Sequence, residues 1–288
     1  MRPLTSENRA AAMVLGSILS VQCGSALATT LFDEVGPGGA VFLRTAFGAL
    51  VLLGLAGRSV RAPRGPERRD VVLFGMALAG MNLSFYAALD RLPLGVAVTL
   101  EFVGPLGVAV FGSRRGRDLV WALLAAAGIA LLSDGLGGAG VDATGALLAL
   151  LAGGFWAAYI LLSARVGNSY PGLGGLAMAM AISAVLVAPF GIAQGEGELL
   201  TPSVLAVGLA VGIFSSAIPY ALELEALRRL PNAVFGVLMS LEPGVAAVVG
   251  FVALSQAVSP VEAVAIGLVV AASAGALRSA ATPAPRDG

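Results

Sequence analysis

Histidine and lysine are both absent from this 288-residue sequence, and cysteine occurs once, at Cys23. Without histidine the chain lacks the commonest metal ligand and the usual general base, and one cysteine gives no disulfide framework. Charged residues are scarce as well: they make up 12% of the chain, whereas a soluble globular domain carries about 25%. We therefore expect no metal site, no cofactor and no enzyme.

Apolar residues take the place of charge. They form 58% of the chain, and the mean hydropathy is +0.92, which predicts a membrane protein whose main partner is the lipid bilayer. The formal net charge is zero, so the composition gives no reason to expect a nucleic-acid partner.

Ten hydrophobic runs follow one another along the chain. They cover residues 10–32, 39–56, 71–89, 94–111, 119–133, 144–163, 173–193, 203–222, 232–254 and 261–277. Their length and their alanine- and leucine-rich composition favour helices that cross a hydrocarbon core of about 30 Å. The expected fold is an all-α polytopic membrane protein with ten transmembrane helices.

Arginines gather on alternate connections between these runs. The segment 57–70 holds five arginines and the segment 112–118 holds three, whereas the connections in between contain only Arg91. Cytoplasmic loops carry the excess of basic residues, so both termini are expected in the cytosol. The terminal tails would cover residues 1–9 and 279–288.

Two stretches of the chain repeat each other. Residues 92–112 read LPLGVAVTLEFVGPLGVAVFG, and residues 230–250 read LPNAVFGVLMSLEPGVAAVVG. A shift of 138 residues, from Leu92 to Leu230, superimposes Pro105 on Pro243. The starts of the two copies are separated by five helices, an odd number, so the copies start on opposite sides of the membrane. This predicts two five-helix repeats of inverted topology. The repeats would cover residues 10–138 and 139–278.

Three charged residues lie inside hydrophobic runs, where a charge costs at least about 2.5–3.5 kcal/mol at the helix centre. Glu242 is at the middle of its run, Glu101 about 10 Å below the outer end of its run, and Arg44 about 6–8 Å from the outer surface. Arg44 can alternatively snorkel to the headgroups or form a structural ion pair. The two acids can alternatively be satisfied by neighbouring helices, but an acid beside a proline in both halves favours a functional role.

Uncharged polar and aromatic residues recur at helical spacing in four runs. A lipid-facing surface gains nothing from such groups, so the pattern predicts a hydrated central cavity. The faces are Gln22 with Ser25 and Thr29, Asn82 with Tyr86, Trp156 with Tyr159 and Ser163, and Ser216 with Tyr220 and Glu223. Any single aromatic among them can instead be a packing residue or an interfacial anchor.

Two prolines and two glycines carry further expectations. Pro105 and Pro243 should interrupt their helices, because proline lacks the backbone donor that the helix needs. An interrupted helix offers the positive end of a half-helix to an anion. Gly208 and Gly212 are spaced four apart and predict close helix packing.

The chain resembles, over nearly its whole length, the drug/metabolite transporter superfamily with its paired EamA-type repeats, and within it the inner-membrane threonine and homoserine exporters. The resemblance is carried by ILSVQCGSALATTLF from Ile18, GVAVTLEFVGPLGVAVFGSRR from Gly95, PYALELEALRRLP from Pro219 and VFGVLMSLEPGVAAVVG from Val234. It implies ten helices in inverted repeats, alternating access, and export of small amino acids from the bacterial cell driven by proton entry. One departure is Gln256, where such exporters usually carry an acid.

The expected cargo is a small zwitterion resembling threonine or homoserine, with protons as the coupling ion. Glu101 or Glu242 would accept the ammonium group, and Arg44, hydroxyl groups or a half-helix end would bind the carboxylate. We favour Glu242 for coupling because it lies deeper. Two alternatives remain: the same fold exporting another polar metabolite or a toxic amphiphile, and a lipid-processing enzyme or a non-transporting sensor. The absence of a nucleophile motif and of a sizeable extramembrane domain in the sequence counts against the second.

Overall fold

A computed structural model describes residues 6–61, 65–112, 119–134, 142–170, 172–227, 229–230 and 232–281. Within these ranges all regular elements are helices, which confirms the predicted all-α class. The predicted boundary between the repeats, both ends of the chain and most of the 112–118 connection lie outside them.

Nine helical spans in the described ranges are long and apolar enough to cross a membrane, and a tenth apolar helix, α6, is shorter. The helices are α1 (Ser6–Thr29), α2 (Phe32–Ala56), α3 (Pro66–Leu89), α4 (Leu94–Glu101), α5 (Val103–Gly112), α6 (Leu119–Asp134), α7 (Ala143–Ser169), α8 (Gly174–Gly195), α9 (Pro202–Gly212), α10 (Ile218–Leu227), α11 (Asn232–Met239), α12 (Glu242–Leu254) and α13 (Pro260–Ala281). Short turns η1 (Gly57–Ser59), η3 (Glu198–Leu200) and η4 (Ile213–Ala217) join some of them.

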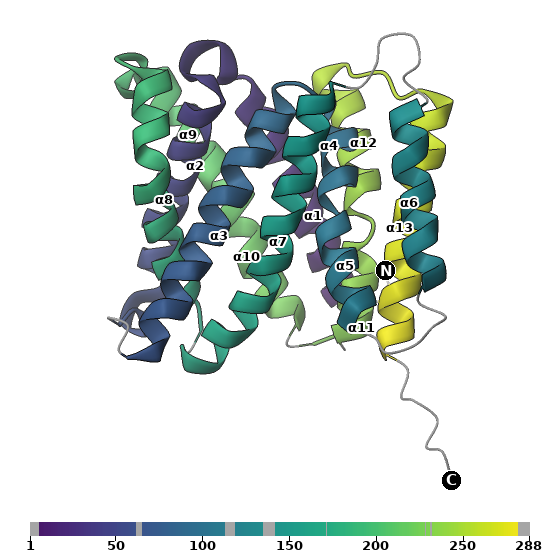
Figure 1. Cartoon of the computed structure of the whole chain (residues 1–288). Helices are drawn as coiled ribbons and strands as arrows, with labels where there is room; N and C mark the ends of the chain where they lie inside the picture. The colour runs from purple at the N-terminus through teal and green to yellow at the C-terminus, as the bar shows by residue number, and fades with distance from the viewer. Residues whose placement is uncertain are drawn as a thin grey trace, which may run out of the picture.

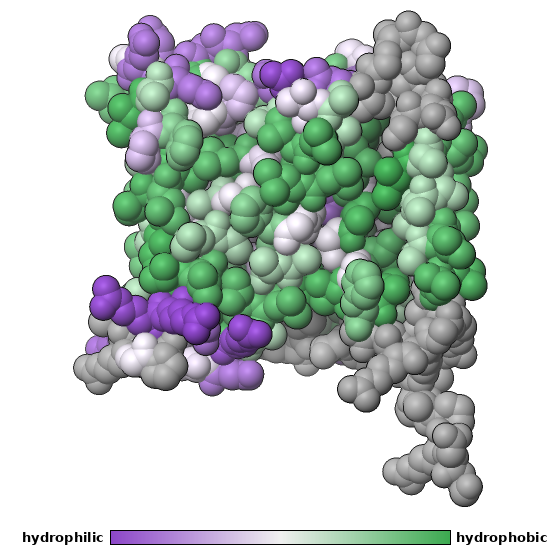
Figure 2. All heavy atoms as spheres, viewed as in Figure 1, coloured by the Kyte–Doolittle hydropathy of each residue, from purple (hydrophilic) through white to green (hydrophobic). Residues whose placement is uncertain are grey.

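The helices stand side by side along one common direction (Figure 1). Figure 2 shows a broad apolar belt across the face in view, with hydrophilic residues gathered at its upper and lower rims. Large apolar side chains project outward from the belt; Phe111, for example, is 91% exposed. Such a surface is stable in hydrocarbon and unfavourable in water, so the chain is a multi-pass membrane protein.

Small residues bring the helices close together. The packed pairs include α2 with α8, α3 with α7 and α6 with α13. The predicted close packing at Gly208 and Gly212 is confirmed. A Cβ on Gly208 would lie 2.9 Å from Leu43 Cβ of α2, and a Cβ on Gly212 would lie 2.8 Å from Phe47 Cβ of α2. Glycine is needed at these positions because helix association in lipid depends on close packing of backbones.

Two membrane spans are broken near their middles. The span α4–α5 is interrupted at Phe102, and the span α11–α12 is interrupted at Ser240 and Leu241. Both breaks come just before a proline, because proline is tolerated in the first turn of a helix, where its missing N–H has no intrahelical partner. The shift of 138 residues places the end of α4 on the end of α11, so the two breaks are equivalent in the sequence repeat. The inverted relation of the two halves stays a prediction.

Arg91, the one arginine on the connections predicted to lie outside, is paired. Its Nη1 lies 3.2 Å from Asp142 Oδ2, and Asp142 Oδ1 accepts a hydrogen bond of 2.6 Å from Gly145 N at the start of α7. The hydrogen bond from Gly145 and the charge of Arg91 lower the pKa of Asp142. The start of α7 is thereby attached to the connection that leads into α4.

Candidate functional site

A cavity of about 840 Å³ lies at the centre of the molecule, beside the two helix breaks. On α5 it is lined by Pro105, Leu106, Val108 and Ala109, and on α11 by Phe235, Gly236 and Met239, whereas α4 and α12 border it only near the breaks. Beyond that point α4 and α12 are in contact, since a Cβ on Gly95 would lie 2.8 Å from Ala247 Cβ. The cavity therefore extends from the breaks toward the α5 and α11 end of the molecule.

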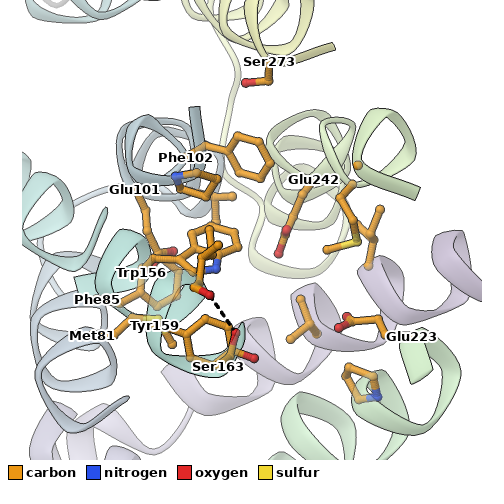
Figure 3. A pocket seen from close by; sticks show the side chains of 18 of the residues that line it. Met81, Phe85, Glu101, Phe102, Trp156, Tyr159, Ser163, Glu223, Glu242 and Ser273 are labelled. Atoms are coloured by element: carbon orange, nitrogen blue, oxygen red, sulfur yellow. Dashed lines mark hydrogen bonds between the residues drawn. The ribbon is translucent and has the colours of Figure 1, made fainter. Parts of the chain in front are cut away.

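Most of the residues expected at the site meet in this cavity. Its lining contains Gln22, Arg44, Asn82, Glu101, Trp156, Tyr159, Tyr220, Glu242 and Pro105. Figure 3 shows Glu101, Glu242, Trp156 and Tyr159 arranged around one open space. Tyr86 and Ser216 are placed elsewhere, contrary to the expectation that they line the cavity.

Glu242 is the first residue of α12, so the break in the span positions its carboxylate at the positive end of a half-helix. Gln22 of α1 donates a hydrogen bond from Nε2 to Glu242 Oε1 over 3.0 Å. Gln22 Oε1 and Glu242 Oε2 have no hydrogen-bond partner, although each residue is more than nine-tenths buried. Both unpartnered atoms are acceptors, which fits a ligand that brings its own donors.

Arg44 lies in the part of α2 that follows a kink at Gly36, and its side chain is buried inside the molecule. Helical residues begin at Phe32 rather than near Gly39, because a short segment that contains Asp33 and Glu34 precedes the kink at Gly36 (φ 66°). Arg44 is only 8% exposed, so the snorkelling alternative is wrong. Its guanidinium reaches Ser215 O at 3.3 Å and Tyr86 Oη at 3.5 Å, and lies 5.5 Å from the centre of the Tyr86 ring.

The guanidinium of Arg44 keeps binding capacity. Its Nε has no hydrogen-bond partner, and none of the ion pairs recorded among the described residues includes it. Tyr86 itself is fully buried; it contacts Arg44 but does not line the cavity. A cation fixed on one side and left without an anion is suited to bind a carboxylate.

Glu101 ends α4 at the other break and is 7% exposed. The break packs directly on α7: a Cβ on Gly153 would lie 2.5 Å from Glu101 O, and a Cβ on Gly104 would lie 1.9 Å from Gly153 O. Only glycine permits this backbone contact. It holds Glu101 where its charge interacts with those of Glu242 and Arg44.

Ser215, not Ser216, borders the cavity. A π-helical turn, η4, occupies Ile213–Ala217, and residues five apart share a side in such a turn. Ser215 therefore falls on the side of Tyr220, whereas the expected spacing of four pointed to Ser216. Ser216 packs against α2, where a Cβ on Gly48 would lie 3.0 Å from Ser216 Oγ.

Glu223 and Ser163, which the sequence places on the polar faces that contain Tyr220 and Tyr159, also line the cavity. Two further lining residues, Ser273 and Phe102, were not predicted. Ser273 gave no signal, since it stands alone in an alanine-rich run, yet it is 2% exposed and its Oγ has no partner. Phe102 also lines the cavity and packs edge-on against Trp156, with 5.3 Å between ring centroids.

Gln256, where an acid was expected, joins the two broken spans. Its Oε1 accepts a hydrogen bond of 2.9 Å from Leu94 N, the first residue of α4. An amide oxygen supplies the acceptor that this helix start requires, as a carboxylate would. Within the described ranges, no group of three or more acidic, cysteine or histidine side chains is arranged to hold a metal ion.

The broken helices and the polar cavity inside an apolar belt are typical of a membrane transporter. A model of the EamA-like transporter family matches residues 143–278. The threonine/homoserine exporter RhtA of Escherichia coli (strain K12) is 44% identical over 265 residues, 91% of this chain and 89% of the relative. RhtA of Salmonella typhimurium (strain SL1344) is 43% identical with the same coverage. The chain belongs to the EamA-like transporter family.

Family membership confirms the resemblance seen in the sequence and the expectation of a transporter rather than an enzyme. A solved crystal structure of a chain 23% identical superimposes with a TM-score of 0.67, covering 95% of this chain and 99% of that chain. This likeness shows a shared fold.

Proposed function

We propose that this protein exports a small zwitterionic amino acid, of the threonine or homoserine type, across the bacterial inner membrane. The observation that carries the proposal is that Glu242 and Arg44, of opposite charge, line one cavity while each keeps an atom without a partner. A zwitterion brings an ammonium group to the carboxylate and a carboxylate to the guanidinium. It thereby satisfies both charges without adding a net charge to a membrane interior.

The names of the relatives support the cargo. The E. coli and Salmonella proteins are named threonine/homoserine exporters, and the similarity covers about nine-tenths of this chain. The cavity also supplies an acceptor for a side-chain hydroxyl. Asn82 Nδ2 donates a hydrogen bond to Leu78 O, and Asn82 Oδ1 has no hydrogen-bond partner.

The deciding experiment is counterflow in proteoliposomes that are preloaded with unlabelled threonine. Labelled threonine and homoserine should enter rapidly. An amino alcohol without the carboxylate and a hydroxy acid without the ammonium should enter slowly. Equal counterflow of all four compounds, or none of any, would reject the zwitterion as cargo. In cells, overproduction should raise tolerance to excess homoserine and lower its intracellular level.

Export is driven by protons that enter through Glu242. An unneutralised carboxylate is costly in the membrane interior, so Glu242 holds either a proton or the ammonium of the cargo. Cargo that binds from the cytosolic side displaces the proton, which leaves to that side. A proton that arrives from outside then displaces the cargo, and the two states face opposite sides by alternating access.

A larger polar metabolite or amphiphile is the second candidate. The cavity of about 840 Å³ exceeds the volume of threonine, and Phe102 and Trp156 give it an aromatic wall. Adding such compounds to the counterflow panel separates the two candidates, because the true cargo competes with labelled threonine at lower concentration.

A further inference from the structure

A third carboxylate borders the cavity and has no role in the function proposed above. Glu223 of α10 accepts a hydrogen bond from Ser17 Oγ of α1 over 2.5 Å, and it stays partly exposed to the cavity. None of the ion pairs recorded among the described residues includes it. Glu101 and Glu242, in contrast, are each 7% exposed.

Helix α1 joins two of the carboxylates. Ser17 contacts Glu223, and Gln22, five residues later, contacts Glu242. Five residues rise about 7.5 Å along a helix, so the two carboxylates stand at different depths. Glu223 is four residues before the end of α10, next to the connection that leads into α11. It therefore lies on the α5 and α11 side of Glu242, toward which the cavity extends.

The charges around Glu223 do not balance when all groups are ionised. The titratable and charged side chains that face the same cavity are Glu101 of α4, Glu242 of α12, Arg44 of α2, Tyr159 of α7 and Tyr220 of α10. Arg44 balances one of the three carboxylates, and a zwitterionic cargo adds no net charge. The other two carboxyl groups are favoured as neutral acids in a membrane interior, so the cavity without cargo holds protons on two of them.

Polar atoms without partners lie along the route between the two acids. Glu242 Oε2 and Gln22 Oε1 are unpartnered, and both residues line the cavity and are more than nine-tenths buried. Figure 3 shows the carboxyl groups of Glu242 and Glu223 at the same open space. Unpartnered buried acceptors of this kind are satisfied by water, and water in the cavity conducts protons.

We propose that Glu223, held by Ser17, is a second proton-binding site through which protons pass between Glu242 and the α5–α11 end of the cavity. The inference rests on the proposed proton-coupled export. When cargo displaces the proton of Glu242, that proton passes to cavity water and then to the Glu223 carboxylate, which becomes a neutral acid. Glu223 next releases it to water at the end of the cavity and is a carboxylate again. Ser17 donates only a hydrogen bond and keeps its own proton.

The test uses purified protein in liposomes and two measurements on labelled threonine. One is accumulation driven by an imposed pH gradient; the other is counterflow without a gradient, measured from acid to alkaline pH. Glu223→Gln keeps the shape of the side chain but cannot bind and release a proton. It should lose gradient-driven accumulation, keep counterflow, and flatten the pH profile of counterflow.

Ser17→Ala provides a second, independent variant. Removing a hydrogen bond that stabilises the carboxylate favours its protonated form, so the midpoint of the counterflow pH profile should move to higher pH. Glu225→Gln is the matched control, since Glu225 is on the same helix but pairs with Arg229 at the surface. It should behave as wild type in both measurements.

Each outcome has one meaning. A wild-type protein that exchanges threonine but ignores the pH gradient would overturn the proton coupling proposed above, and with it this inference. A coupled wild type together with a Glu223→Gln variant that retains accumulation and an unchanged pH profile would overturn the role of Glu223 alone. If Glu223→Gln loses counterflow as well, the profile of Ser17→Ala decides: a shifted midpoint supports the proton site, and an unshifted one rejects it.

Discussion

Gln22 Nε2 lies 3.0 Å from Glu242 Oε1, and this hydrogen bond connects α1 to the first residue of the half-helix α12. It orients the carboxylate so that its second oxygen, which has no partner, is free to bind a ligand. The position of Glu242 thus depends on a residue 220 positions away in the sequence.

Replacing Gln22 by leucine should weaken transport without unfolding the protein. A hydrogen bond to a charged group contributes about 1.5–3 kcal/mol, so its loss should lower counterflow at limiting threonine about tenfold or more. Ser20→Ala is the control, because Ser20 is on the same helix and also loses one hydrogen bond, to Phe214 O, but does not line the cavity. Equal counterflow by the two variants would show that the orientation of Glu242 does not depend on Gln22.

The two acids at the helix breaks should respond differently to amide substitution. Glu242→Gln resembles the protonated acid, so it should abolish accumulation driven by a pH gradient and leave some exchange. Glu101→Gln should mainly raise the threonine concentration needed for half-maximal counterflow. Both are measured in liposomes with and without an imposed gradient. Undiminished gradient-driven accumulation by Glu242→Gln would exclude its coupling role, and loss of coupling in Glu101→Gln instead would exchange the two assignments.

Arg44→Lys should discriminate between cargoes. Lysine keeps the positive charge but loses the planar fork that binds a carboxylate through two hydrogen bonds. Counterflow of threonine should therefore be strongly reduced relative to wild type. The ability of threoninol, which has no carboxylate, to inhibit counterflow should be reduced less. A loss of the same size for both compounds would indicate that Arg44 only maintains the structure through Tyr86 and Ser215.

Gly153 and Gly154 offer a matched pair for stability. A Cβ on Gly153 would lie 2.5 Å from Glu101 O, whereas a Cβ on Gly154 would meet nothing within 4 Å. Gly153→Ala should destabilise the protein by about 1–3 kcal/mol or more, as overpacking does, and Gly154→Ala should be neutral or slightly stabilising. Thermal unfolding in detergent measures both. A Gly153→Ala variant as stable as Gly154→Ala would contradict the backbone contact between α7 and the α4–α5 break.

The orientation in the membrane follows from the arginines and can be tested with single cysteines in a Cys23→Ser background. Arg58 and Gly197 are both exposed. Arg58 follows the end of α2 and Gly197 follows the end of α8, and the two lie at opposite ends of this packed helix pair. With both termini in the cytosol, Gly197→Cys should react with an impermeant thiol reagent in intact cells, and Arg58→Cys should react only after lysis. The reverse pattern would invert the predicted topology.

Hydrophobicity and polar periodicity were sufficient to predict the helices and most of the cavity wall. Lipid leaves so few uses for buried polar groups that residues such as Gln22 and Asn82 could be assigned to an interior from the sequence alone. The π-turn at Ile213–Ala217 could not be predicted, because it depends on how α1 and α2 pack around it and not on its own composition. The burial of Arg44 could not be predicted for a similar reason, since it depends on contacts with Tyr86 and Ser215, which lie far away in the sequence.

The contact of Gly104 with Gly153 has a consequence for how this transporter could be adapted to a bulkier cargo. The two glycines do not line the cavity, and backbone atoms alone form their contact, so every substitution there adds atoms between α7 and the α4–α5 break. The aromatic pair Phe102 and Trp156 differs, because both side chains line the cavity and can be replaced by smaller ones. Divergence toward larger cargo, by selection or by engineering, therefore has room at Phe102 and Trp156, while Gly104 and Gly153 stay glycine in any variant that keeps the backbone contact.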